Sequence, residues 1–531
     1  MMINALAIAA FSVVASVKCV HMLQIESYQS NMYLKWLVRS GFRPFLPYIV
    51  AATISILTHY TLSGFYRTMP DMNVTVYASD AVHVLLLLAI GIINRFKKYK
   101  KSFVITTRVK RLLVALFLMY AASNYLFIVI LDNHHLFVVA VRYAIASLIP
   151  LIVMAGNYIV APVERLIHCY YFSSARRKIK SFKNLSKICI VGSYGKTTTK
   201  YALNAILSKR YKTIMTPSSV NTPMGIARVV REDLKEDHEI FIIEMGERYE
   251  GDIDELCKML NPQYALVTDI GKQHLETFGT QESIISTISE VMDNLPQDGV
   301  IFFNGDSSIC KELYDKCELG QKYLFGIEDG DNYLTATSIQ TTKRGSAFEI
   351  NTSNGETMSC TTKLLGKHNI RNVLGASAVA KYFCLSMLEI QEGIAAVDPI
   401  SHRLEVLPGE ITVIDNTYSS NPAGAKAALE VLMSFAPSKK IVITPGMIEL
   451  GKEEKMLNRE YGVNMAGVAD VVILIGKKRT AAIAQGLKDA KFPEDRIIAV
   501  GTLDEAVKIL PMYVSSDSVV LFENDLPDTY S

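Results

Sequence analysis

Long apolar runs dominate the first third of the chain. They lie at about residues 3–22, 45–64, 76–93, 112–131 and 136–160. Each run is close to the ~20 residues that an α-helix needs to cross the hydrocarbon core of a bilayer. The third run is the weakest candidate for a membrane-spanning helix, because it contains Asp80 and His83. The pattern predicts a helical transmembrane region of about five helices over residues 1–165.

A second pattern begins near residue 187, where short apolar runs alternate with helical stretches. This alternation is typical of βα units around a parallel sheet. The expected strands are 187–191, 239–247 and one beginning at 265, followed after residue 403 by 411–415, 440–444, 471–475, 496–500 and 517–522. We therefore expect an α/β central domain with a parallel sheet over residues 186–402 and a Rossmann-like C-terminal domain over residues 403–531.

The distribution of charge separates the same two regions. Residues 1–185 carry 20 Lys and Arg against five Asp and Glu, whereas the remainder carries 35 against 47. The stretch 95–111 holds eight basic residues and no acid, which predicts a cytoplasmic loop, because basic loops stay on the cytoplasmic side. Five spans with the amino terminus outside then leave the α/β domains in the cytoplasm. This topology predicts a multi-pass protein of the inner (plasma) membrane.

Two features of the membrane region leave alternatives open. Arg142, inside the fifth run, is either an intramembrane functional group or a residue that extends to the outer edge of its helix. The basic stretch "PVERLIHCYYFSSARRKIKSFK" lies within or beside the juxtamembrane linker expected over residues 166–185. It fits either an amphipathic segment lying on anionic lipid or a plain helical linker.

Cysteine usage adds little chemistry. The eight cysteines are scattered, and no Cys-x-x-Cys pair occurs. Neither a zinc site nor a disulfide framework is indicated. Reduced cysteines in a cytosolic domain fit this pattern.

A glycine-rich stretch carries the clearest chemistry. The expected strand 187–191 is followed by "GSYGKT" and then by a helix through about residue 208. Gly192 and Gly195 let backbone N–H groups wrap a phosphate at a helix N-terminus. Lys196 is placed to reach the β- and γ-phosphates, and Thr197 to ligate Mg²⁺. The loop is shorter than the usual six-residue form, yet its strand–loop–helix context predicts nucleotide binding.

Two further residues are expected at the same edge of the sheet. Glu244 lies at the carboxyl end of the apolar run in the expected strand 239–247. A carboxylate at this position suits a Mg²⁺ ligand. His274 follows the strand that begins at residue 265. A histidine at a strand end beside a phosphate site is a candidate functional group.

Six stretches, in order and spacing, resemble the Mur ligases, which form amide bonds on bacterial cell-wall precursors. They are "GSYGKTTTK", "EMGERYEGDIDEL", "TDIGKQHLETFGTQES", "LLGKHNIRNVLGASAVA", "IDNTYSSNPAGAKAAL" and "ITPGMIELG", within about residues 187–522. The branch that adds D-alanyl-D-alanine is the most similar. The resemblance implies that ATP phosphorylates a carboxylate and that an amine then attacks the acyl phosphate.

The resemblance also implies a role for each matching residue. Lys196 holds the phosphates, Thr197 and Glu244 hold a first Mg²⁺, and His274 holds a second. The other implied ATP-binding residues are Gly192, Ser193, Gly195 and Thr198 in the loop, Asn304, His368 and Asn372 at the adenine, Asp415 at the ribose, and Arg403 at a phosphate. Asn221, Tyr418 and Asn421 are implied near the second substrate, although Asn304, Tyr418 and Asn421 also fit ordinary turn and loop positions.

Three departures from the family pattern concern the metal and the substrates. The position of a carbamate-bearing lysine that helps to hold the second Mg²⁺ falls on Ile288, which cannot ligate a metal. The end of the chain, residues 522–531, is acidic where the family pattern is basic. The domain that binds a uridine-diphosphate sugar is replaced by the membrane region. The helices therefore either hold a lipid-linked acceptor or only anchor the enzyme.

The leading hypothesis is a membrane-bound, ATP-dependent ligase that adds an amino acid or dipeptide to a peptidoglycan-type precursor, UDP-linked or lipid-linked. One alternative is a ligase for another polymer, such as a poly-γ-glutamate capsule. Another, suggested by Ile288, is a catalytically weak scaffold that binds ATP and recruits cell-wall enzymes. An ATP-driven transporter fits less well, because no separate motif of transport ATPases occurs. No feature indicates nucleic-acid binding.

Overall fold

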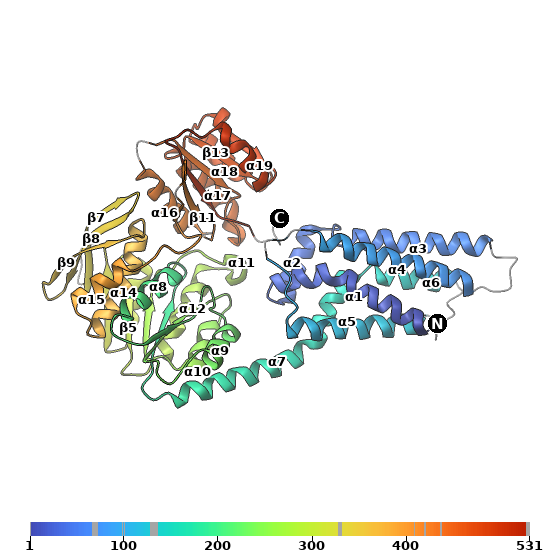
Figure 1. The fold of residues 1–531 in the computed structure, drawn as a ribbon, viewed down its shortest axis with the longest axis horizontal. Coiled ribbons are helices and arrows are strands. Elements are labelled where there is room, and N and C mark those ends of the chain that lie inside the picture. Colours follow the sequence, from blue (N-terminus) through green and yellow to red (C-terminus); the bar gives the residue numbers. More distant parts are fainter. Residues whose placement is uncertain are drawn as a thin grey trace. The chain divides into compact units, whose positions relative to one another are not determined.

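The computed structural model describes residues 2–65, 73–97, 99, 101–127, 136–327, 332–407, 409–418, 421–435 and 438–526. It divides into two compact units (Figure 1). One comprises residues 1–169 with the last six residues, and the other comprises residues 170–525.

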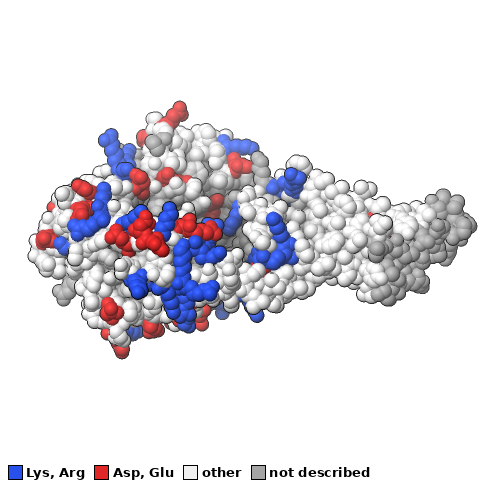
Figure 2. All heavy atoms as spheres, turned by 60° about the horizontal axis from the view of Figure 1, so that its bottom comes forward, with Lys and Arg blue, Asp and Glu red and all other residues white. Residues whose placement is uncertain are grey.

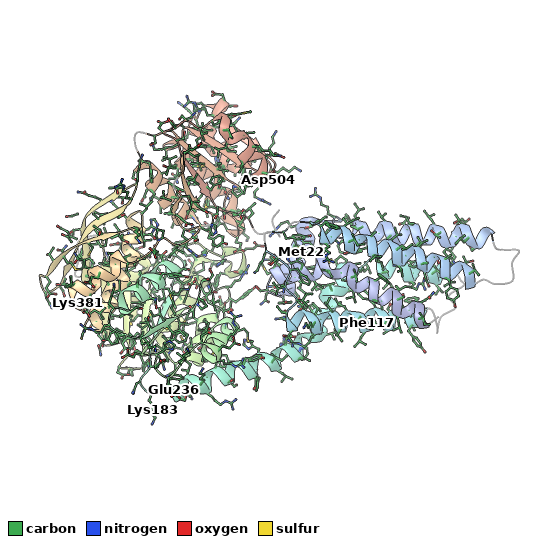
Figure 3. All side chains as sticks on the ribbon, in the orientation of Figure 1. Met22, Phe117, Lys183, Glu236, Lys381 and Asp504 are labelled. Atoms are coloured by element: carbon green, nitrogen blue, oxygen red, sulfur yellow. The ribbon has the colours of Figure 1, made fainter. Side chains whose placement is uncertain are left out.

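The first unit is built from helices. They are α1 (Met2–Ile25), α2 (Ser30–Ser40), α3 (Leu46–Phe65), α4 (Asn73–Arg95), α5 (Thr107–Tyr125), α6 (Leu136–Ala146) and α7 (Ile149–Ser181), of which α7 continues into the second unit. Figure 2 shows that this region exposes few charged side chains on the face in view. Its packed interior includes Met22, which Figure 3 labels.

Four of the described helices are long and apolar enough to cross a membrane, against the five spans expected from the sequence. They cover Ile3–Ile25, Leu46–Gly64, Val74–Arg95 and Ile149–Ser181. Most of the expected fourth run lies in α5, whose first five residues include Arg108, Lys110 and Arg111. The expected fifth run is divided into the short helix α6 and the start of α7. Residues 128–135, which hold the end of the fourth run and most of the following loop, lie outside the described residues.

The third run, expected to be the weakest, is the most apolar of the four spans. Its Asp80 is buried and forms an ion pair with Arg142 of α6. Tyr143 Oη also donates to Asp80 Oδ1 at 2.7 Å. The Arg142 side chain is only 3% exposed and therefore does not extend to the outer edge of its helix. A charge pair explains why Asp80 and Arg142 are tolerated in these apolar helices.

The second unit begins with a nine-stranded sheet in the order β2-β3-β1-β4-β5-β6-β7-β8-β9. Its strands are β1 (Ser186–Val191), β2 (Thr213–Met215), β3 (Ile240–Glu244), β4 (Tyr264–Val267), β5 (Val300–Asn304), β6 (Gln321–Gly326), β7 (Leu334–Thr342), β8 (Gly345–Thr352) and β9 (Thr357–Thr362). Strands β3, β1, β4 and β5 are parallel neighbours and almost wholly buried. This explains their near-continuous apolar sequences.

Helices cover both faces of this sheet. They are α8 (Lys196–Leu207), α9 (Pro223–Glu232), α10 (Asp252–Leu260), α11 (Leu275–Phe278), α12 (Gln281–Asn294), α13 (Ser308–Lys316), α14 (Lys367–Tyr382) and α15 (Met387–Ala395). One apolar core joins the sheet to α9, α10, α12 and α13, and also contains Ala175 and Ile179 from the end of α7. The other core joins the sheet to α8, α14 and α15.

The last part of the second unit is a six-stranded sheet in the order β10-β11-β15-β12-β13-β14. Its strands are β10 (Glu405–Leu407), β11 (Thr412–Asn416), β12 (Lys440–Thr444), β13 (Val471–Ile475), β14 (Ile497–Val500) and β15 (Val519–Glu523). The helices are α16 (Pro422–Met433), α17 (Glu454–Ala466), α18 (Ala481–Asp489) and α19 (Leu503–Ile509), with short 3₁₀ turns at Gly451–Glu453, Glu494–Arg496 and Leu510–Met512. The five strands predicted here are confirmed, and they pair in parallel.

Candidate active site

The glycine loop lies between β1 and α8, as the sequence predicts. Gly192 and Gly195 adopt positive φ angles of 130° and 79°, which favour glycine. A Cβ added to Gly195 would lie 2.2 Å from Oδ1 of Asn372. The loop therefore needs glycine for its conformation and, at Gly195, for space as well. It ends at the N-terminus of α8, where backbone N–H groups favour an anion.

The remaining loop residues are tied to neighbouring backbone. The Ser193 hydroxyl donates to the carbonyl of Gly271 and accepts from its N–H, both at 3.1 Å. Thr197 and Thr198, in the first turn of α8, are buried. These contacts hold the loop against the segment that follows β4.

Lys196 is engaged by a carboxylate. Its Nζ donates to Oε1 and Oε2 of Glu247 at 2.8 and 3.0 Å, and also to the carbonyl of Gly192. The Glu247 side chain is 2% exposed. Burial raises the pKa of Glu247, while the charge of Lys196 opposes that rise. Lys196, which is expected to hold phosphates, is thus paired with the carboxylate of Glu247.

Glu244 is the centre of a second polar group. Its Oε1 accepts from Thr197 Oγ1 at 3.1 Å and from Asn221 Nδ2 at 3.3 Å. Its Oε2 accepts from Nζ of Lys200 at 2.9 Å, and the Lys200 side chain is fully buried. Burial lowers the pKa of Lys200, and Glu244 counteracts this. Burial also lowers the pKa of Arg403, which lies close enough to Glu244 for its charge to oppose that change.

The donor set around Thr197 and Glu244 fits Mg²⁺. A hydroxyl and a carboxylate oxygen are hard ligands of the kind that this ion prefers. Among the described residues, no three His, Cys, Asp or Glu side chains gather to form a metal site.

His274 is held by a residue from the last sheet's domain. Its Nδ1 lies 2.6 Å from Oε2 of Glu449, in the segment after β12. Arg248 donates to the other oxygen of Glu449 at 3.3 Å. His274 itself has a positive φ of 52°, an uncommon conformation for a residue other than glycine. This conformation and the Glu449 contact give the imidazole a defined orientation.

Three expected adenine-side residues have different surroundings. Asn372 lies against Gly195, beside the loop. Asn304 ends β5 fully buried, and its Oδ1 accepts from the N–H of Asp306 at 3.0 Å. His368 stands in the first turn of α14, where burial lowers its pKa to about 4. Only Asn372 has a contact that joins it to the phosphate loop among the described residues.

Whereas Arg403 lies close to Glu244, the other expected residues of the last domain, Asp415, Tyr418 and Asn421, form no hydrogen bond or ion pair with Glu244 or Glu247 among the described residues. Asp415 Oδ2 lies 2.8 Å from Nδ1 of His402, and the ring of Tyr418 packs on that of His402. Tyr418 is 61% exposed. Asn421 caps α16, because its Oδ1 accepts from the N–H of Gly424 at 2.7 Å. The ordinary turn position that was the alternative for Asn421 therefore explains its contacts.

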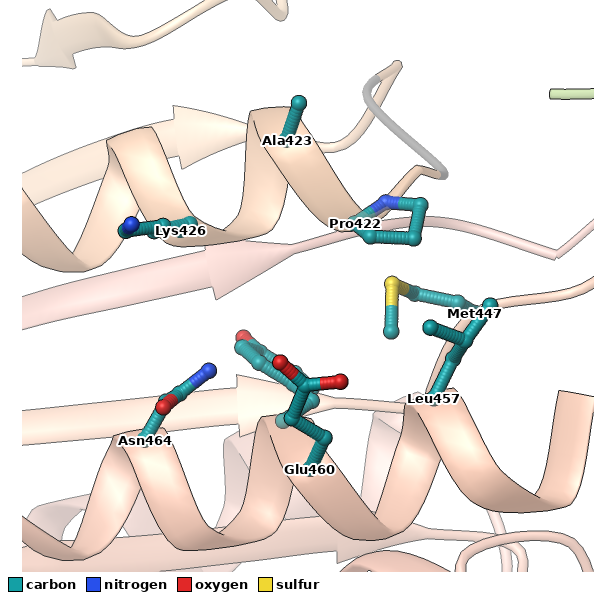
Figure 4. A pocket seen from close by; sticks show the side chains of 8 residues that line it. Pro422, Ala423, Lys426, Met447, Leu457, Glu460 and Asn464 are labelled. Carbon is teal, nitrogen blue, oxygen red and sulfur yellow. The ribbon is translucent and has the colours of Figure 1, made fainter. Parts of the chain in front are cut away.

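A groove of about 200 Å³ opens beside this cap. Figure 4 shows Pro422 and Lys426 of α16 on one side and Glu460 and Asn464 of α17 on the other, with Met447 at one end. Lys426 and Glu460 give its two sides opposite charges. Met447 lies two residues before Glu449. The groove is therefore close along the chain to the residue that orients His274.

Comparison with known protein families agrees with this geometry. Residues 190–380 match the Mur ligase middle domain, and residues 402–523 match the Mur ligase glutamate ligase domain. The chain belongs to the Mur ligase family. Both matches begin after residue 189, so the helical unit lies outside the part of the chain that defines this membership.

The relatives of this Mur ligase include members of one branch, the UDP-N-acetylmuramoyl-tripeptide–D-alanyl-D-alanine ligases, or MurF. A UDP-N-acetylmuramoyl-tripeptide–D-alanyl-D-alanine ligase of Bacillus subtilis is 29% identical over 341 residues, which are 63% of this chain and 72% of that protein. MurF of Acinetobacter baumannii is similar in structure, with a TM-score of 0.62, 25% identity, and coverage of 67% of this chain and 77% of that one. MurF of Thermotoga maritima, solved in complex with ADP, shares the fold with a TM-score of 0.59 at 23% identity, over 67% of this chain and 80% of that one.

Three residues of this Mur ligase escaped the sequence reasoning although each lies within a stretch that carried the resemblance. They are Lys200, Glu247 and Glu449. Glu247 follows Glu244 by three residues, and this spacing was the signal in the sequence that could have identified it as a site residue. Ile288 of α12 is fully buried in the apolar core, so it has no ligating role. The residues expected in the acidic tail beyond 526 lie outside the described residues.

Proposed function

We propose that this chain is an ATP-dependent amide ligase that extends a peptidoglycan-type precursor through an acyl phosphate. The observation that carries this proposal is the glycine loop that ends at Lys196 and Thr197 at the start of α8, where the Thr197 hydroxyl donates to Glu244. Membership of the Mur ligase family and the ADP complex of a structural neighbour support ATP as the nucleotide. The similarity to UDP-N-acetylmuramoyl-tripeptide–D-alanyl-D-alanine ligases supports an amino acid or dipeptide as the amine.

The residues suit the two steps of such a reaction. In the first step, a substrate carboxylate oxygen attacks the γ-phosphorus of ATP, and the bond to the bridging oxygen of ADP breaks. Lys196 and the loop N–H groups hold the phosphates, and Arg403 adds positive charge near Glu244. In the second step, the amine attacks the acyl carbon, phosphate leaves, and the amine loses a proton. Mg²⁺ held by Thr197 and Glu244, with a second ion at His274, would neutralise charge on the phosphates.

We also propose that the helical unit anchors the ligase in the plasma membrane with its α/β domains in the cytoplasm. Four helices of sufficient length and apolarity support this, as does the basic stretch 95–111. Exposed Arg176, Arg177 and Lys180 near the end of α7 suit contact with anionic lipid. Such an anchor places the active site near acceptors that are lipid-linked or formed at the membrane.

A phosphate-release assay tests the ligase. The full chain in detergent is given ATP, Mg²⁺ and pairs of carboxylate and amine candidates, including a UDP-linked tripeptide precursor with D-alanyl-D-alanine. We expect phosphate release only when acid and amine are both present, and Lys196→Ala to abolish it. ATP binding without release for any pair would instead support a scaffold, which the apolar Ile288 favours.

A truncation tests what the helices do. The core of the second unit includes Phe172, Ala175 and Ile179, so the shortened protein should begin at residue 170 rather than after the basic stretch. Loss of turnover on a lipid-linked acceptor, with full turnover on a soluble one, would show that the helices hold the acceptor. Equal turnover on both would leave them as an anchor.

A further inference from the structure

The bond between Lys196 and Glu247 conflicts with the role that the loop assigns to Lys196. Both carboxylate oxygens of Glu247 accept from Nζ, at 2.8 and 3.0 Å. The Lys196 side chain is 11% exposed and that of Glu247 only 2%. A bound nucleotide needs the same ammonium group for its phosphates. Nucleotide binding therefore removes the positive charge that compensates Glu247.

A buried carboxylate left charged without a cation is strongly destabilising, so Glu247 must then take up either a proton or another positive charge. Three nearby cations already have carboxylate partners, and a fourth, Arg403, adds its charge at Glu244. Lys200 donates to Glu244, Arg248 to Glu449 and Lys272 to Glu453. Each of these cations would uncover another carboxylate if it moved to Glu247. The cation that arrives together with a nucleotide is Mg²⁺.

The position of His274 favours the same conclusion. It lies close enough to Glu247 to have an electrostatic effect on that carboxyl. Its Nδ1 is held by Glu449 at 2.6 Å, which directs the other ring nitrogen, Nε2, away from that bond. A carboxylate that orients an imidazole in this way is common behind a metal-ligating histidine. One carboxylate, one imidazole, phosphate oxygens and water make a suitable Mg²⁺ environment.

We propose that Glu247 exchanges Lys196 for a divalent cation when a nucleotide binds, and that with His274 it forms the protein part of the second Mg²⁺ site. Glu247 thereby has two states. Without nucleotide it neutralises Lys196, and with nucleotide it ligates the ion. This inference rests on the proposed function only in requiring that the loop binds ATP.

The test counts bound metal rather than turnover. Full-length protein in detergent is saturated with a non-hydrolysable ATP analogue and titrated with Mn²⁺, and bound Mn²⁺ is measured by electron paramagnetic resonance. We expect two ions per wild-type complex and one for Glu247→Gln. Glu250→Gln, a matched change at an exposed carboxylate in the same segment, should keep two. Glu247→Asp should keep two, with the second bound several-fold more weakly.

A second measurement separates ligation from damage to the fold. In the presence of a chelator, Glu247→Gln should bind the analogue several-fold more tightly than wild type, because Lys196 is released. Two ions bound to Glu247→Gln, one ion bound to wild type, or weaker metal-free binding by that variant would each overturn the inference. Failure of the wild type to bind the analogue at all would instead refute the proposed function.

Discussion

Glu523 offers a test of how the C-terminal domain responds to pH. It ends β15, which lies between β11 and β12 in the six-stranded sheet, and is 1% exposed. Its Oε2 accepts from Nδ2 of Asn416 at 2.8 Å, whereas its Oε1 has no hydrogen-bond partner among the described residues. Burial raises the pKa of Glu523 to about 8, and the Asn416 contact opposes this only partly.

The sign of the effect follows from proton binding. The native state holds the proton up to about pH 8, whereas the unfolded chain releases it near the ordinary value of 4.5. The native state therefore binds more protons between these values, and stability falls as pH rises through this window. Glutamine cannot ionise, so Glu523→Gln should remove this pH-dependent loss of stability. At ~1.4 kcal/mol per pKa unit, its advantage over wild type should grow by about 4 kcal/mol between pH 5 and pH 9.

The assay is thermal unfolding of the full chain in detergent, followed by circular dichroism from pH 5 to pH 9. At roughly 2 °C per kcal/mol, the melting temperature of Glu523→Gln should gain about 8 °C on wild type across that range. Glu430→Gln, at an exposed position of α16, should follow wild type throughout. A constant difference between Glu523→Gln and wild type at every pH would refute the assignment of a buried, protonated carboxyl.

Three further substitutions test the loop and the buried ion pairs. Gly195→Ala should weaken binding of a fluorescent ATP analogue at least ~10-fold, because a β-carbon would meet Asn372 and strain a left-handed residue; unchanged affinity would contradict the loop geometry. Lys200→Met should cost about 3–5 kcal/mol in chemical unfolding by leaving Glu244 buried without its cation, and adding Glu244→Gln should recover part of that loss. Arg142→Gln should destabilise the helical unit by a similar ~3–5 kcal/mol, seen as a lower melting temperature in detergent, and an unchanged value would argue against the ion pair.

Local patterns predicted the α/β class, the first strands of the central sheet and the parallel strands of the last domain. The five predicted strands of the last domain agree with the structure within about two residues, because each is a short, buried, apolar run between helices. Strands β2, β5, β6 and β10 were not predicted, and neither were the antiparallel strands β7, β8 and β9. Their sequences are rich in Thr and Ser and alternate only weakly, so they depend on pairing with one another along the sheet. Cross-strand contacts of this kind leave little trace in a local pattern.

The membrane region shows a similar division. Its long apolar runs predicted the helices, but the fifth run proved to be two helices, and the ion-pair partner of Arg142 lies 62 residues away along the chain. No spacing rule connects Asp80 with Arg142. The reason that a charge is tolerated in such a helix becomes visible only when the helices are packed together.

The sequence by itself determined the phosphate loop and its family. Gly192, Gly195, Lys196 and Thr197 lie within six residues of one another, and their function follows from backbone geometry at the start of a helix. The partners of the charged groups were decided only by the tertiary structure. Glu247 meets Lys196 across 51 residues, and His274 meets Glu449 across 175. Such pairs depend on which strand ends the fold brings to one edge, because electrostatic interactions act over distance in space and not along the chain.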